Sequence, residues 1–474
     1  MGHDYDVAVI GAGPAGEKAA IKAAYFGKKV VLVERAEKFG GACGAGGLAS
    51  KILRESALVY RGAARRLSDV LQPVPRREIE MQNLLRALDL VCDAHYVGVK
   101  HAIESHGIEW RRGTARFEDP HRLSVTSPSG ERTELTAEII VVASGSRPSQ
   151  PSFVPWGAPN VYHADTVLEM KTLPRCLTVV GGGVIGTELA SIFGALGVDV
   201  HVIEQRPKLL GFLDEDVSDH LMKELAARGT HMHLGREVTA CTPNVEKGGV
   251  DVVTDDGATV HADAVLFCGG RLANTDELAL DTIGVALGRQ GRPVVDEVFR
   301  TSVPHVYAVG DVIGFPALAS TSMEQGRTAI GHALRHLIKT RPDALPFDDS
   351  LPYPLLPYGL YTIPSVAMVG KTEAQLRAEG TPYVEGVSSF ARHARGHLIG
   401  DTSGRLKLLA DPKTRTVLGV HIVGETAEDL IHIGQACMHY GGTIDYFLRT
   451  VFNFPTLASL YKSASYDVLQ KLRG

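Results

Sequence analysis

Two short glycine patterns in the sequence have the spacing that binds the pyrophosphate of a dinucleotide. In a G-x-G-x-x-G pattern the first glycine allows a tight turn and the second lets the pyrophosphate approach the backbone. The third glycine lets a helix pack closely on a strand, so that the pyrophosphate lies at the positive end of that helix. The patterns consist of Gly11, Ala12, Gly13, Pro14, Ala15 and Gly16, and of Gly181, Gly182, Gly183, Val184, Ile185 and Gly186. Two copies in one chain predict two dinucleotide sites.

An acidic residue follows each pattern where a carboxylate would accept hydrogen bonds from ribose hydroxyls. These residues are Glu34, with Arg35 beside it, and Glu204. Arg206 lies two residues after Glu204 and could reach the 2′-phosphate of NADP, which the carboxylate of Glu204 would repel. We therefore expect the second site to admit both nucleotides and to bind NAD(H) more readily.

The residues around each pattern are expected to form a strand, a glycine turn, a helix and a second strand. Apolar, β-branched runs predict buried parallel strands on both sides of an alanine-rich or apolar helix. A glycine ends each helix. For the first site the expected ranges are 5–10, 17–26 and 29–33. For the second they are a strand over 177–180, a helix opened by residues 181–186 and running to about 196, and a strand over 199–203.

Other apolar patterns predict the remaining elements. Spacings of three and four indicate helices, and short β-branched runs indicate strands. Expected helices are 51–60, 81–103, 321–338, 427–439 and 457–472. Expected strands, besides short ones in 108–135, are 137–142, 251–253, 264–267, 306–311, 366–369, 406–409 and 417–423. Residues 342–357 are proline-rich and are typical of a linker.

Composition excludes several classes of protein. The chain has 474 residues, enough for two to four domains, and a formal net charge of -5, which argues against nucleic acid as the main partner. The six cysteines form no C-x-x-C pattern, so we predict no metal site and no disulfide scaffold, and five of them are expected to be small buried side chains. We find no signal peptide and no apolar run of about 20 residues, and expect a cytoplasmic protein.

The segment Gly40–Lys51 begins like the redox-active segment of the flavoprotein disulfide reductases, which reads G-G-x-C-x4-C-x-P-S-K. Here Cys43 is the only cysteine, Ala49 replaces the proline, and one residue is missing before Ser50 and Lys51. In that family a His also precedes a Pro-Thr pair near the C-terminus, and a Glu follows that proline by four residues. Phe454 and Ser459 occupy these positions. The dithiol and its acid–base pair are therefore absent together.

Nearly the whole chain resembles the glutathione reductase and lipoamide dehydrogenase superfamily, and within it most closely the soluble pyridine nucleotide transhydrogenases. The resemblance rests on both glycine patterns and the segment above, and on residues 143–145, 211–219, 270–271, 308–326, 359–364 and 451–456. It implies an α/β fold with two Rossmann-like domains, for FAD and NAD(P), and a C-terminal α+β dimerisation domain. The implied division is 1–150 (FAD domain, first part), 151–270 (NAD(P) domain), 271–345 (FAD and central domain, second part) and 346–474 (dimer interface).

The resemblance also implies roles for particular residues. Lys51 would lie beside flavin N5 and pair with Glu188, because a cation there favours the anionic reduced flavin. Asp311 would hydrogen-bond the ribitol or phosphate region of FAD. Cys43 would pack on the flavin ring or act as a thiol, and we favour packing. Further cofactor-binding positions are Gly41, Ala42, Ala143, Ser144, Gly145, Gly270 and Gly310.

These observations favour a cytoplasmic homodimeric flavoprotein oxidoreductase that moves hydride between NADPH or NADH and NAD or NADP through FAD. Without a dithiol, the flavin would have to pass on its electrons directly. An NAD(P)H diaphorase or quinone reductase is the first alternative, since the glycine-rich residues 44–47 could leave room for a flat acceptor. A true disulfide reductase fits less well. A flavin-binding redox sensor or subunit is an alternative of another class.

Overall fold

The computed structural model describes residues 2–41, 47–66, 79–335 and 355–473. The chain forms two compact units, each made of three stretches of sequence. The first unit contains Met1–Ser50, Arg86–Ser149 and Gly270–Leu351, and the second contains Lys51–Leu85, Gln150–Gly269 and Pro352–Gly474.

The first unit is built on five parallel strands in the order β3-β2-β1-β6-β17. Its strands are β1 (Tyr5–Ile10), β2 (Val30–Glu34), β3 (Glu109–Arg112), β6 (Arg132–Val142) and β17 (Val306–Ala308). The strands β1 and β2 are almost wholly buried, as expected for central strands of a parallel sheet. The first half of β6 pairs instead with antiparallel β5 (Arg122–Thr126), which pairs with β4 (Thr114–Asp119). The short strands β7 (Ser146–Pro148) and β16 (Arg271–Ala273) form a separate antiparallel pair.

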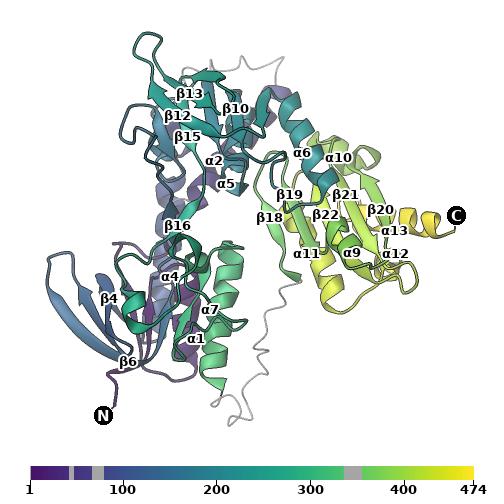
Figure 1. Cartoon of the computed structure of the whole chain (residues 1–474). Coiled ribbons are helices and arrows are strands. Elements are labelled where there is room, and N and C mark those ends of the chain that lie inside the picture. Colours follow the sequence, from purple (N-terminus) through teal and green to yellow (C-terminus); the bar gives the residue numbers. More distant parts are fainter. Residues whose placement is uncertain (1, 42–46, 67–78, 336–354, 474) are drawn as a thin grey trace. The chain divides into compact units, whose positions relative to one another are not determined.

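Three helices contribute to the core on one side of this sheet: α1 (Pro14–Tyr25), α4 (Leu88–Ser105) and α7 (Ala319–Ala333). The helices α1 and α7 run side by side, as Figure 1 shows. A Cβ atom at Gly326 would lie only 2.2 Å from the carbonyl oxygen of Ala15, so glycine is what allows this close contact. The packing fixes the N-terminal end of α1, where the first glycine pattern lies.

In the second unit, residues 150–269 form a parallel sheet with the strand order β11-β10-β9-β15-β8. Its strands are β8 (Val161–His163), β9 (Cys176–Val180), β10 (Asp199–Glu204), β11 (Thr230–Leu234) and β15 (Ala264–Phe267). Two helices accompany it, α5 (Val184–Ala195) and α6 (Glu215–Ala227). A three-stranded antiparallel sheet follows the order β12 (Val238–Pro243), β13 (Val250–Thr254) and β14 (Thr259–Ala262), and shares a buried apolar cluster with the parallel sheet.

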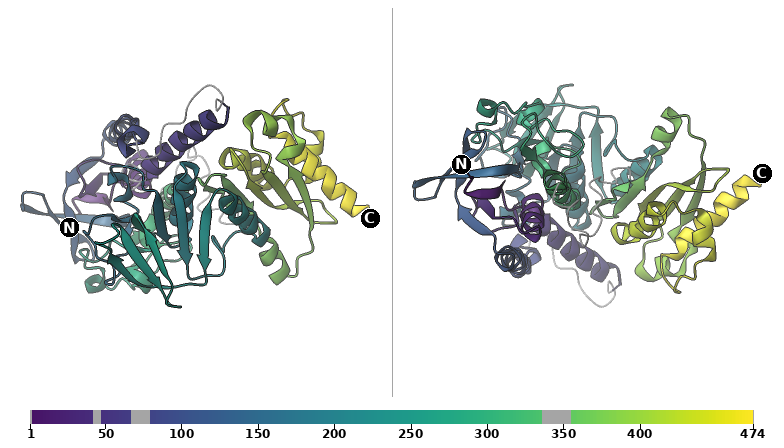
Figure 2. Two further views of the ribbon diagram at one scale, coloured as in Figure 1. Left: turned by 90° about the horizontal axis from the view of Figure 1, so that it is seen from above. Right: turned by 90° about the horizontal axis from the view of Figure 1, so that it is seen from below.

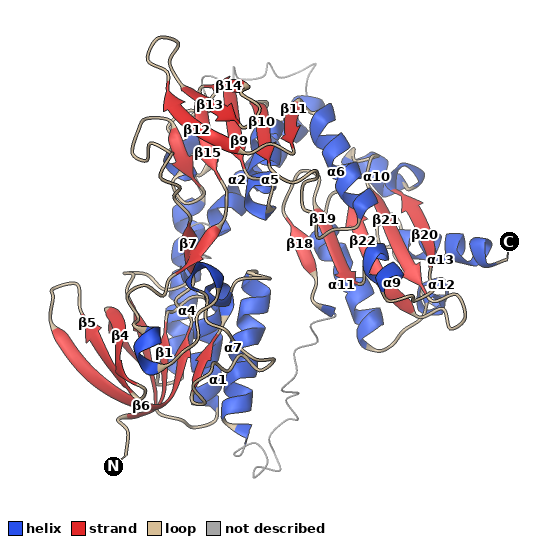
Figure 3. Ribbon diagram, viewed as in Figure 1, coloured by secondary structure: helices blue, strands red, loops and turns tan. Residues whose placement is uncertain are grey.

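The C-terminal part of the second unit is a five-stranded antiparallel sheet flanked by helices (Figure 3). In order the strands are β18 (Tyr358–Leu360), β19 (Val366–Gly370), β22 (Val417–Val423), β21 (Arg405–Ala410) and β20 (Val384–Ser389). The helices are α9 (Glu373–Ala378), α10 (Ala394–Ile399), α11 (Ala427–His439), α12 (Ile444–Arg449) and α13 (Ser459–Leu472), and α13 lies along β20 and β21 (Figure 2). The same unit holds most of α2 (Leu48–Arg66) and the one-turn helix α3 (Met81–Leu84).

The α/β fold class predicted from the sequence is confirmed, with shifted element ends. The helix expected over 81–103 is interrupted around residues 85–87, between α3 and α4, and the helix expected over 321–338 ends at Ala333. The strand expected over 137–142 begins earlier, at Arg132, because its first half joins a second sheet. The division of the chain at residues 150, 270 and 345 into domain segments remains a prediction. Among the described residues, no helix is long and apolar enough to cross a membrane.

Candidate active site and dinucleotide sites

The first glycine pattern forms a turn that side chains would not permit. Gly11 has φ 103°, and a Cβ atom there would lie 2.3 Å from the carbonyl oxygen of Ala143. A Cβ atom at Gly16 would lie 1.8 Å from the carbonyl oxygen of Gly11. Both contacts are far shorter than van der Waals distances, so glycine is required at each position. The result is the close strand–helix turn that the sequence predicts.

The N-terminal end of α1 is open to a ligand. Gly13 is the N-cap of α1 and Pro14 its first residue, where the missing N–H of proline does no harm. Gly41 has φ 54°, and a Cβ atom on it would come within 3.0 Å of the Cα atom of Gly13. Two backbone segments without side chains therefore meet at the positive end of the helix dipole, which suits a pyrophosphate.

Glu34 lies at the end of β2 and is buried. Its Oε2 accepts a hydrogen bond from the backbone N–H of Ala12 at 2.7 Å, and its Oε1 accepts one from Ala36 at 2.8 Å. These bonds fix the carboxylate, and each oxygen keeps a further lone pair for a ribose hydroxyl. The neighbouring Arg35 is exposed.

The end of β6 adds a polar group that needs a partner. The hydroxyl oxygen of Ser144 is buried and has no hydrogen-bond partner among the described residues, which indicates a ligand atom. Asn274 holds the backbone here, donating through its side-chain amide to the carbonyl oxygen of Ser144 and through its backbone N–H to that of Gly145, both at 3.0 Å. Gly145 has φ 71°.

Asp311 lies in the same unit, just after β17. Its carboxylate accepts a hydrogen bond from Ser146 Oγ at 3.3 Å, and Arg271 donates to Ser146 through two nitrogens at 2.8 Å. Gly310 has φ 80° and donates its N–H to Gln325 Oε1 at 2.7 Å. Gly270, with φ 128°, accepts a hydrogen bond from the backbone N–H of Ser149. Together with the turn, the carboxylate and the buried hydroxyl, these residues fit a bound FAD.

The second unit joins Lys51 and Glu188, as the resemblance implies. Lys51 Nζ lies 2.9 Å from Glu188 Oε2, and the Glu188 side chain is only 8% exposed. Tyr361 completes the arrangement: its backbone N–H donates to Glu188 Oε1 at 2.8 Å, and its ring centroid lies 4.7 Å from Lys51 Nζ. The carboxylate and the ring both stabilise a positive charge on Lys51.

The loop that carries Tyr361 is itself held to α2 and α5. Arg54, one turn after Lys51 and 3% exposed, donates to Thr362 O at 3.3 Å and to Ser365 Oγ at 2.5 Å. The backbone N–H of Ile363 donates to Ser191 Oγ at 3.0 Å, one turn after Glu188. The position of Tyr361 is therefore set by the same two helices that carry the ion pair.

The second glycine pattern repeats the geometry of the first. Gly181 has φ 107°, and a Cβ atom on it would lie 2.6 Å from the carbonyl oxygen of Cys268. A Cβ atom at Gly186 would lie 1.9 Å from the carbonyl oxygen of Gly181. Gly183 is the N-cap of α5, and no atom of the described residues lies within 4 Å of a Cβ placed on it. Val184 and Ile185 begin α5, so a phosphate can approach this end of the helix.

Glu204 lies at the end of β10 and forms an ion pair with Arg206, the residue for which the sequence predicts contact with a 2′-phosphate. Arg206 donates to Glu204 Oε1 through Nε at 2.9 Å and to Oε2 through Nη2 at 3.1 Å. The N–H of Gly182 also donates to Oε2, at 2.6 Å. Burial acts to raise the pKa of Glu204, but the hydrogen bonds from Arg206 and Gly182 outweigh it and lower the pKa. Glu204 is therefore a buried carboxylate, whereas the side chain of its partner Arg206 is exposed and can turn away from it.

Not every residue that the sequence singles out can be compared with the structure. Ala42 and Cys43 are outside the described residues. The prediction of five buried cysteines is confirmed for Cys241 and Cys437, and burial raises the pKa of both thiols to about 11. It is wrong for Cys92, Cys176 and Cys268, which are half-buried.

The sequence analysis also missed residues that support the sites, because their hydrogen bonds join distant parts of the chain: Gly182, Ser191, Asn274, Gln325 and Tyr361. The only signal for Tyr361 is its place within residues 359–364.

Known proteins are similar to this chain over nearly its full length. Relatives named soluble pyridine nucleotide transhydrogenase include one from Mycobacterium tuberculosis, 40% identical over 99% of this chain and 98% of that protein. Another, from Chromohalobacter salexigens, is 38% identical over 99% of both. Among solved structures, LpdA of Mycobacterium tuberculosis has a TM-score of 0.88 at 25% identity, covering 97% of this chain and 99% of that one. The HOCl-induced flavoprotein disulfide reductase RclA of Escherichia coli has a TM-score of 0.84 at 25% identity, covering 98% and 99%.

Family models match almost the whole chain. Residues 5–326 match the pyridine nucleotide-disulphide oxidoreductase model, and residues 356–465 match the dimerisation domain of the same family. FAD is the cofactor of this family, which confirms that part of the sequence prediction, and the dimerisation domain supports the predicted homodimer. The chain therefore belongs to the pyridine nucleotide-disulphide oxidoreductases.

Proposed function

We propose that the protein is an FAD-dependent NAD(P) transhydrogenase, which moves hydride from NADPH or NADH to the other oxidised nucleotide without a redox disulfide. The observation that carries this is the 40% identity, over nearly the full length, to relatives named for that activity. The sequence agrees, because no second cysteine follows Cys43 before Lys51, and because Phe454 and Ser459 replace the acid–base pair of the disulfide reductases.

Bound FAD would supply a two-electron carrier that accepts hydride from one nicotinamide and returns it to another. We propose that Gly11, Gly13, Gly16, Glu34 and Asp311 hold this cofactor. The further cofactor contacts we propose are Pro14, Ala15, Arg35, Gly41, Ala42, Ala143, Ser144, Gly145, Gly270 and Gly310.

Lys51 acts as a fixed cation facing the flavin in this proposal, and Glu188 holds the ammonium in place. The support is the 2.9 Å ion pair and the 2.8 Å hydrogen bond from Tyr361 to the same carboxylate. Since the carboxylate is bound at both oxygens, it requires no reorganisation when charge develops on the reduced flavin. Cys43 has no cysteine partner in the segment, and we propose that it packs on the flavin ring.

Nicotinamide nucleotides bind at Gly181, Gly183, Val184, Ile185 and Gly186 in this proposal, and Glu204 selects between them. When NAD(H) binds, Glu204 accepts from its ribose hydroxyls. When NADP(H) binds, Arg206 leaves the Glu204 carboxylate for the 2′-phosphate, which also accepts a bidentate contact and carries more negative charge. One site can then serve both substrates in turn, as a ping-pong reaction needs.

The test is an anaerobic experiment in two stages. The purified yellow protein is reduced with NADH, freed of nucleotide, and mixed separately with NADP, menadione and lipoamide while the flavin absorbance is followed. Rapid reoxidation by NADP, and parallel steady-state lines with NADPH and thio-NAD, support the transhydrogenase. Intersecting lines with no thio-NAD reduction would contradict it.

The same experiment separates the alternatives. The glycine-rich residues 44–47 favour a quinone reductase as second candidate, which predicts reoxidation by menadione far faster than by NADP. A redox sensor predicts slow reoxidation by every small acceptor. A cytoplasmic location remains part of the proposal, to be checked by fractionating cells and assaying the flavoprotein.

A further inference from the structure

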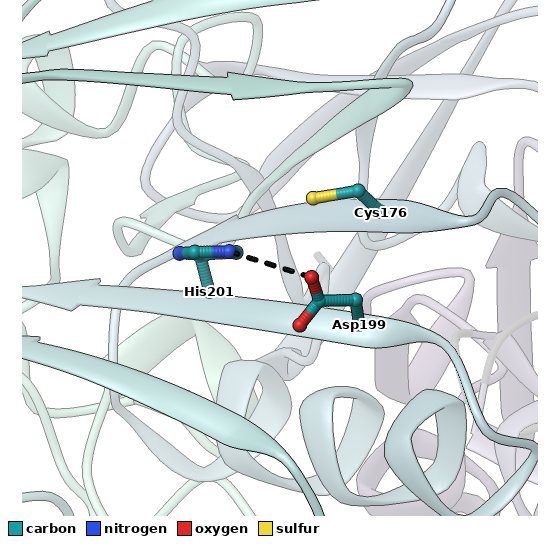
Figure 4. Close-up of side chains that lie close together, drawn as sticks. All are labelled: Cys176, Asp199 and His201. Atoms are coloured by element: carbon teal, nitrogen blue, oxygen red, sulfur yellow. Dashed lines mark ion pairs between the residues drawn. The ribbon is translucent and has the colours of Figure 1, made fainter.

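Three side chains with metal-binding atoms meet on one face of the sheet in residues 150–269. Cys176 Sγ, a carboxylate oxygen of Asp199 and a ring nitrogen of His201 all lie within 4.8 Å of one another. Figure 4 shows them projecting from the same side of two neighbouring strands, Cys176 from β9 and the other two from β10. The group lies outside both glycine patterns.

The strand register explains the meeting. Cys176 is paired directly with Asp199 in the parallel ladder between β9 and β10. His201 lies two residues after Asp199, and residues two apart in a strand point to the same face of the sheet. His201 is in turn paired with His231 on β11, and His233 follows two residues later on that face. One thiol, one carboxylate and three imidazoles thus occupy one face of three adjacent strands.

A second layer of contacts orients these side chains. His201 Nδ1 lies 3.0 Å from His233 Nε2, and His201 Nε2 is directed toward Asp199 Oδ2, 3.9 Å away. If His201 donates its Nδ1–H to His233, its Nε2 lone pair points at the thiol and the carboxylate, which is how partners of metal-binding histidines set the tautomer. His231 Nε2 lies 3.1 Å from Asp199 Oδ1, the other carboxylate oxygen.

A buried polar atom lies on the same face. Thr178 is paired with His201 in the ladder and is fully buried, and its hydroxyl has no hydrogen-bond partner among the described residues. Asp263 places a carboxylate beside Cys176, accepting the backbone N–H of Cys176 at 3.1 Å, and also pairs with the exposed Arg175 at 3.5 Å. Both features favour a cation, or its bound water, over an empty apolar contact.

We propose that Cys176, Asp199 and His201 bind a divalent transition-metal ion of the zinc class, with His231 or water completing the coordination. Thiolate and imidazole select such ions over magnesium and calcium, which prefer oxygen ligands. Metal–ligand bonds of about 2.0–2.3 Å put neighbouring ligand atoms roughly 3.5 Å apart. Since the three atoms already lie within 4.8 Å of one another, small side-chain rotations are enough to bring them to one ion. On binding, the thiol releases its proton to solvent and the sulfur donates a lone pair to the ion.

A second group of carboxylates shows why this site is different. Asp214, Asp216 and Glu373 also lie close enough together to share an ion. Their centre, however, is already occupied by the ammonium of Lys407, at 2.9, 2.5 and 2.9 Å. Among the described residues, the group around Cys176 is the one whose ligand atoms do not surround a cationic side chain.

The site lies at the opposite end of the strands from the nucleotide. Cys176 and Asp199 are the first residues of β9 and β10, whereas Gly181 follows the end of β9 and Glu204 ends β10. At about 3.3 Å per residue the two ends are roughly 15 Å apart, so the ion does not touch the hydride-transfer site. It would tie β9 to β10 and so stabilise the sheet that positions Gly181 and Glu204.

The experiment measures Zn²⁺ binding to the FAD-loaded protein by equilibrium dialysis, with Mg²⁺ as the competing ion. We expect one Zn²⁺ per chain in the wild type. Cys176→Ser and His201→Gln should lose more than about 100-fold in affinity, and His233→Gln roughly 10- to 100-fold, because it only orients His201. Cys92→Ser and His101→Gln are the matched controls on α4 and should bind as the wild type does.

Wild-type protein that takes up no Zn²⁺, or variants Cys176→Ser and His201→Gln that bind it unchanged, would overturn the proposal. A second measurement covers variants that fail to fold. Adding Co²⁺ to the wild type and to Cys92→Ser should produce a thiolate-to-cobalt absorption in the difference spectrum, and its absence from both would equally overturn the proposal. Neither readout depends on turnover, so the result is independent of the transhydrogenase activity.

Discussion

Glu188 is the residue on which the proposed active site most depends, because it binds Lys51 and the backbone of Tyr361 at once. Glu188→Gln keeps an acceptor for Tyr361 but removes the charge that fixes the ammonium. We expect flavin reduction by NADH to slow by roughly 10²-fold, as for other losses of preorganised electrostatic groups. Anaerobic stopped-flow absorbance measures this rate. Glu385→Gln, which breaks the exposed ion pair between Glu385 and Lys471, is the control, and equal rates in the two variants would refute the role.

Arg206 separates the two nucleotides in the proposed site. Arg206→Ala removes the bidentate partner of Glu204 and the group that would bind a 2′-phosphate. A charged hydrogen bond is worth about 1.5–3 kcal/mol, so the KM for NADPH should rise by 10-fold or more while that for NADH stays the same or falls. Steady-state kinetics with both substrates checks this. Arg236→Ala is the control, because the side chain of Arg236 pairs with Asp256 and not with Glu204. This variant should leave the KM values for NADPH and NADH unchanged.

At the residue scale, sequence alone predicted what depends on local spacing. Both glycine patterns, Glu34 and Glu204 were found because the turn, the helix and the next strand have fixed lengths. Lys51 and Glu188 were paired only through the family resemblance, since no local rule joins residues so far apart. The group around Cys176 was missed altogether, and the expectation of no metal site was drawn from the lack of C-x-x-C. Its ligands come from two different strands, and only the register aligns them.

At the scale of elements, the contact between α1 and α7 offers a sharp test. Gly326→Ala would place a methyl group 2.2 Å from the carbonyl oxygen of Ala15, and the backbone must move to relieve it. We expect a loss of about 1–3 kcal/mol in the free energy of unfolding and weaker FAD retention. Urea unfolding followed by circular dichroism measures the first, and flavin released on dilution measures the second.

Gly98→Ala in α4 is the matched control, because nothing among the described residues lies within 4 Å of its added methyl group. Alanine favours a helix over glycine by about 1 kcal/mol, so this variant should be unchanged or more stable. If both variants were stabilised alike, the close packing of α1 on α7 would not be the constraint we infer.

The C-terminal sheet is joined to the start of α6 by a buried charged network, and this predicts a dependence on pH. His421, on β22, is 1% exposed and lies 3.3 Å from Asp214, and burial lowers its pKa despite the nearby carboxylates. A lowered folded-state pKa means that the unfolded chain binds the proton first. Stability should therefore be full above the unfolded pKa of about 6.5 and decline as the pH falls below it.

Urea unfolding at pH 8 and at pH 5.5 measures this loss. His421→Gln can still donate to the carbonyl oxygen of Lys371, but it has no proton to gain, so its stability should decline less between the two pH values. The exposed His439→Gln should decline as the wild type does. An equal decline in all three proteins would place the pH dependence in other histidines whose pKa is lowered by burial, such as the half-buried His220.

Element ends were harder to predict than elements. Strand β1 and helix α11 have the bounds that the apolar patterns indicate. β6 does not, because its first three residues are exposed and its first half pairs with β5, while most of its second half is buried in the parallel sheet. A single strand that serves two sheets has no single periodicity, so the sequence showed only the buried half. The order of strands in each sheet depends on contacts between distant residues and could not be read from patterns.

For the whole molecule, the absent dithiol predicts how many electrons the protein can hold. A flavin takes up two electrons, and a redox disulfide beside it would take up two more. Because the segment after Cys43 contains no second cysteine, anaerobic titration with dithionite should bleach the flavin at about two electrons per bound FAD. Cys43→Ser should give the same end point if Cys43 only packs on the ring. Uptake of four electrons by the wild type, falling to two in Cys43→Ser, would reveal a sulfur partner elsewhere in the chain and would remove the physical reason for direct transfer between nucleotides.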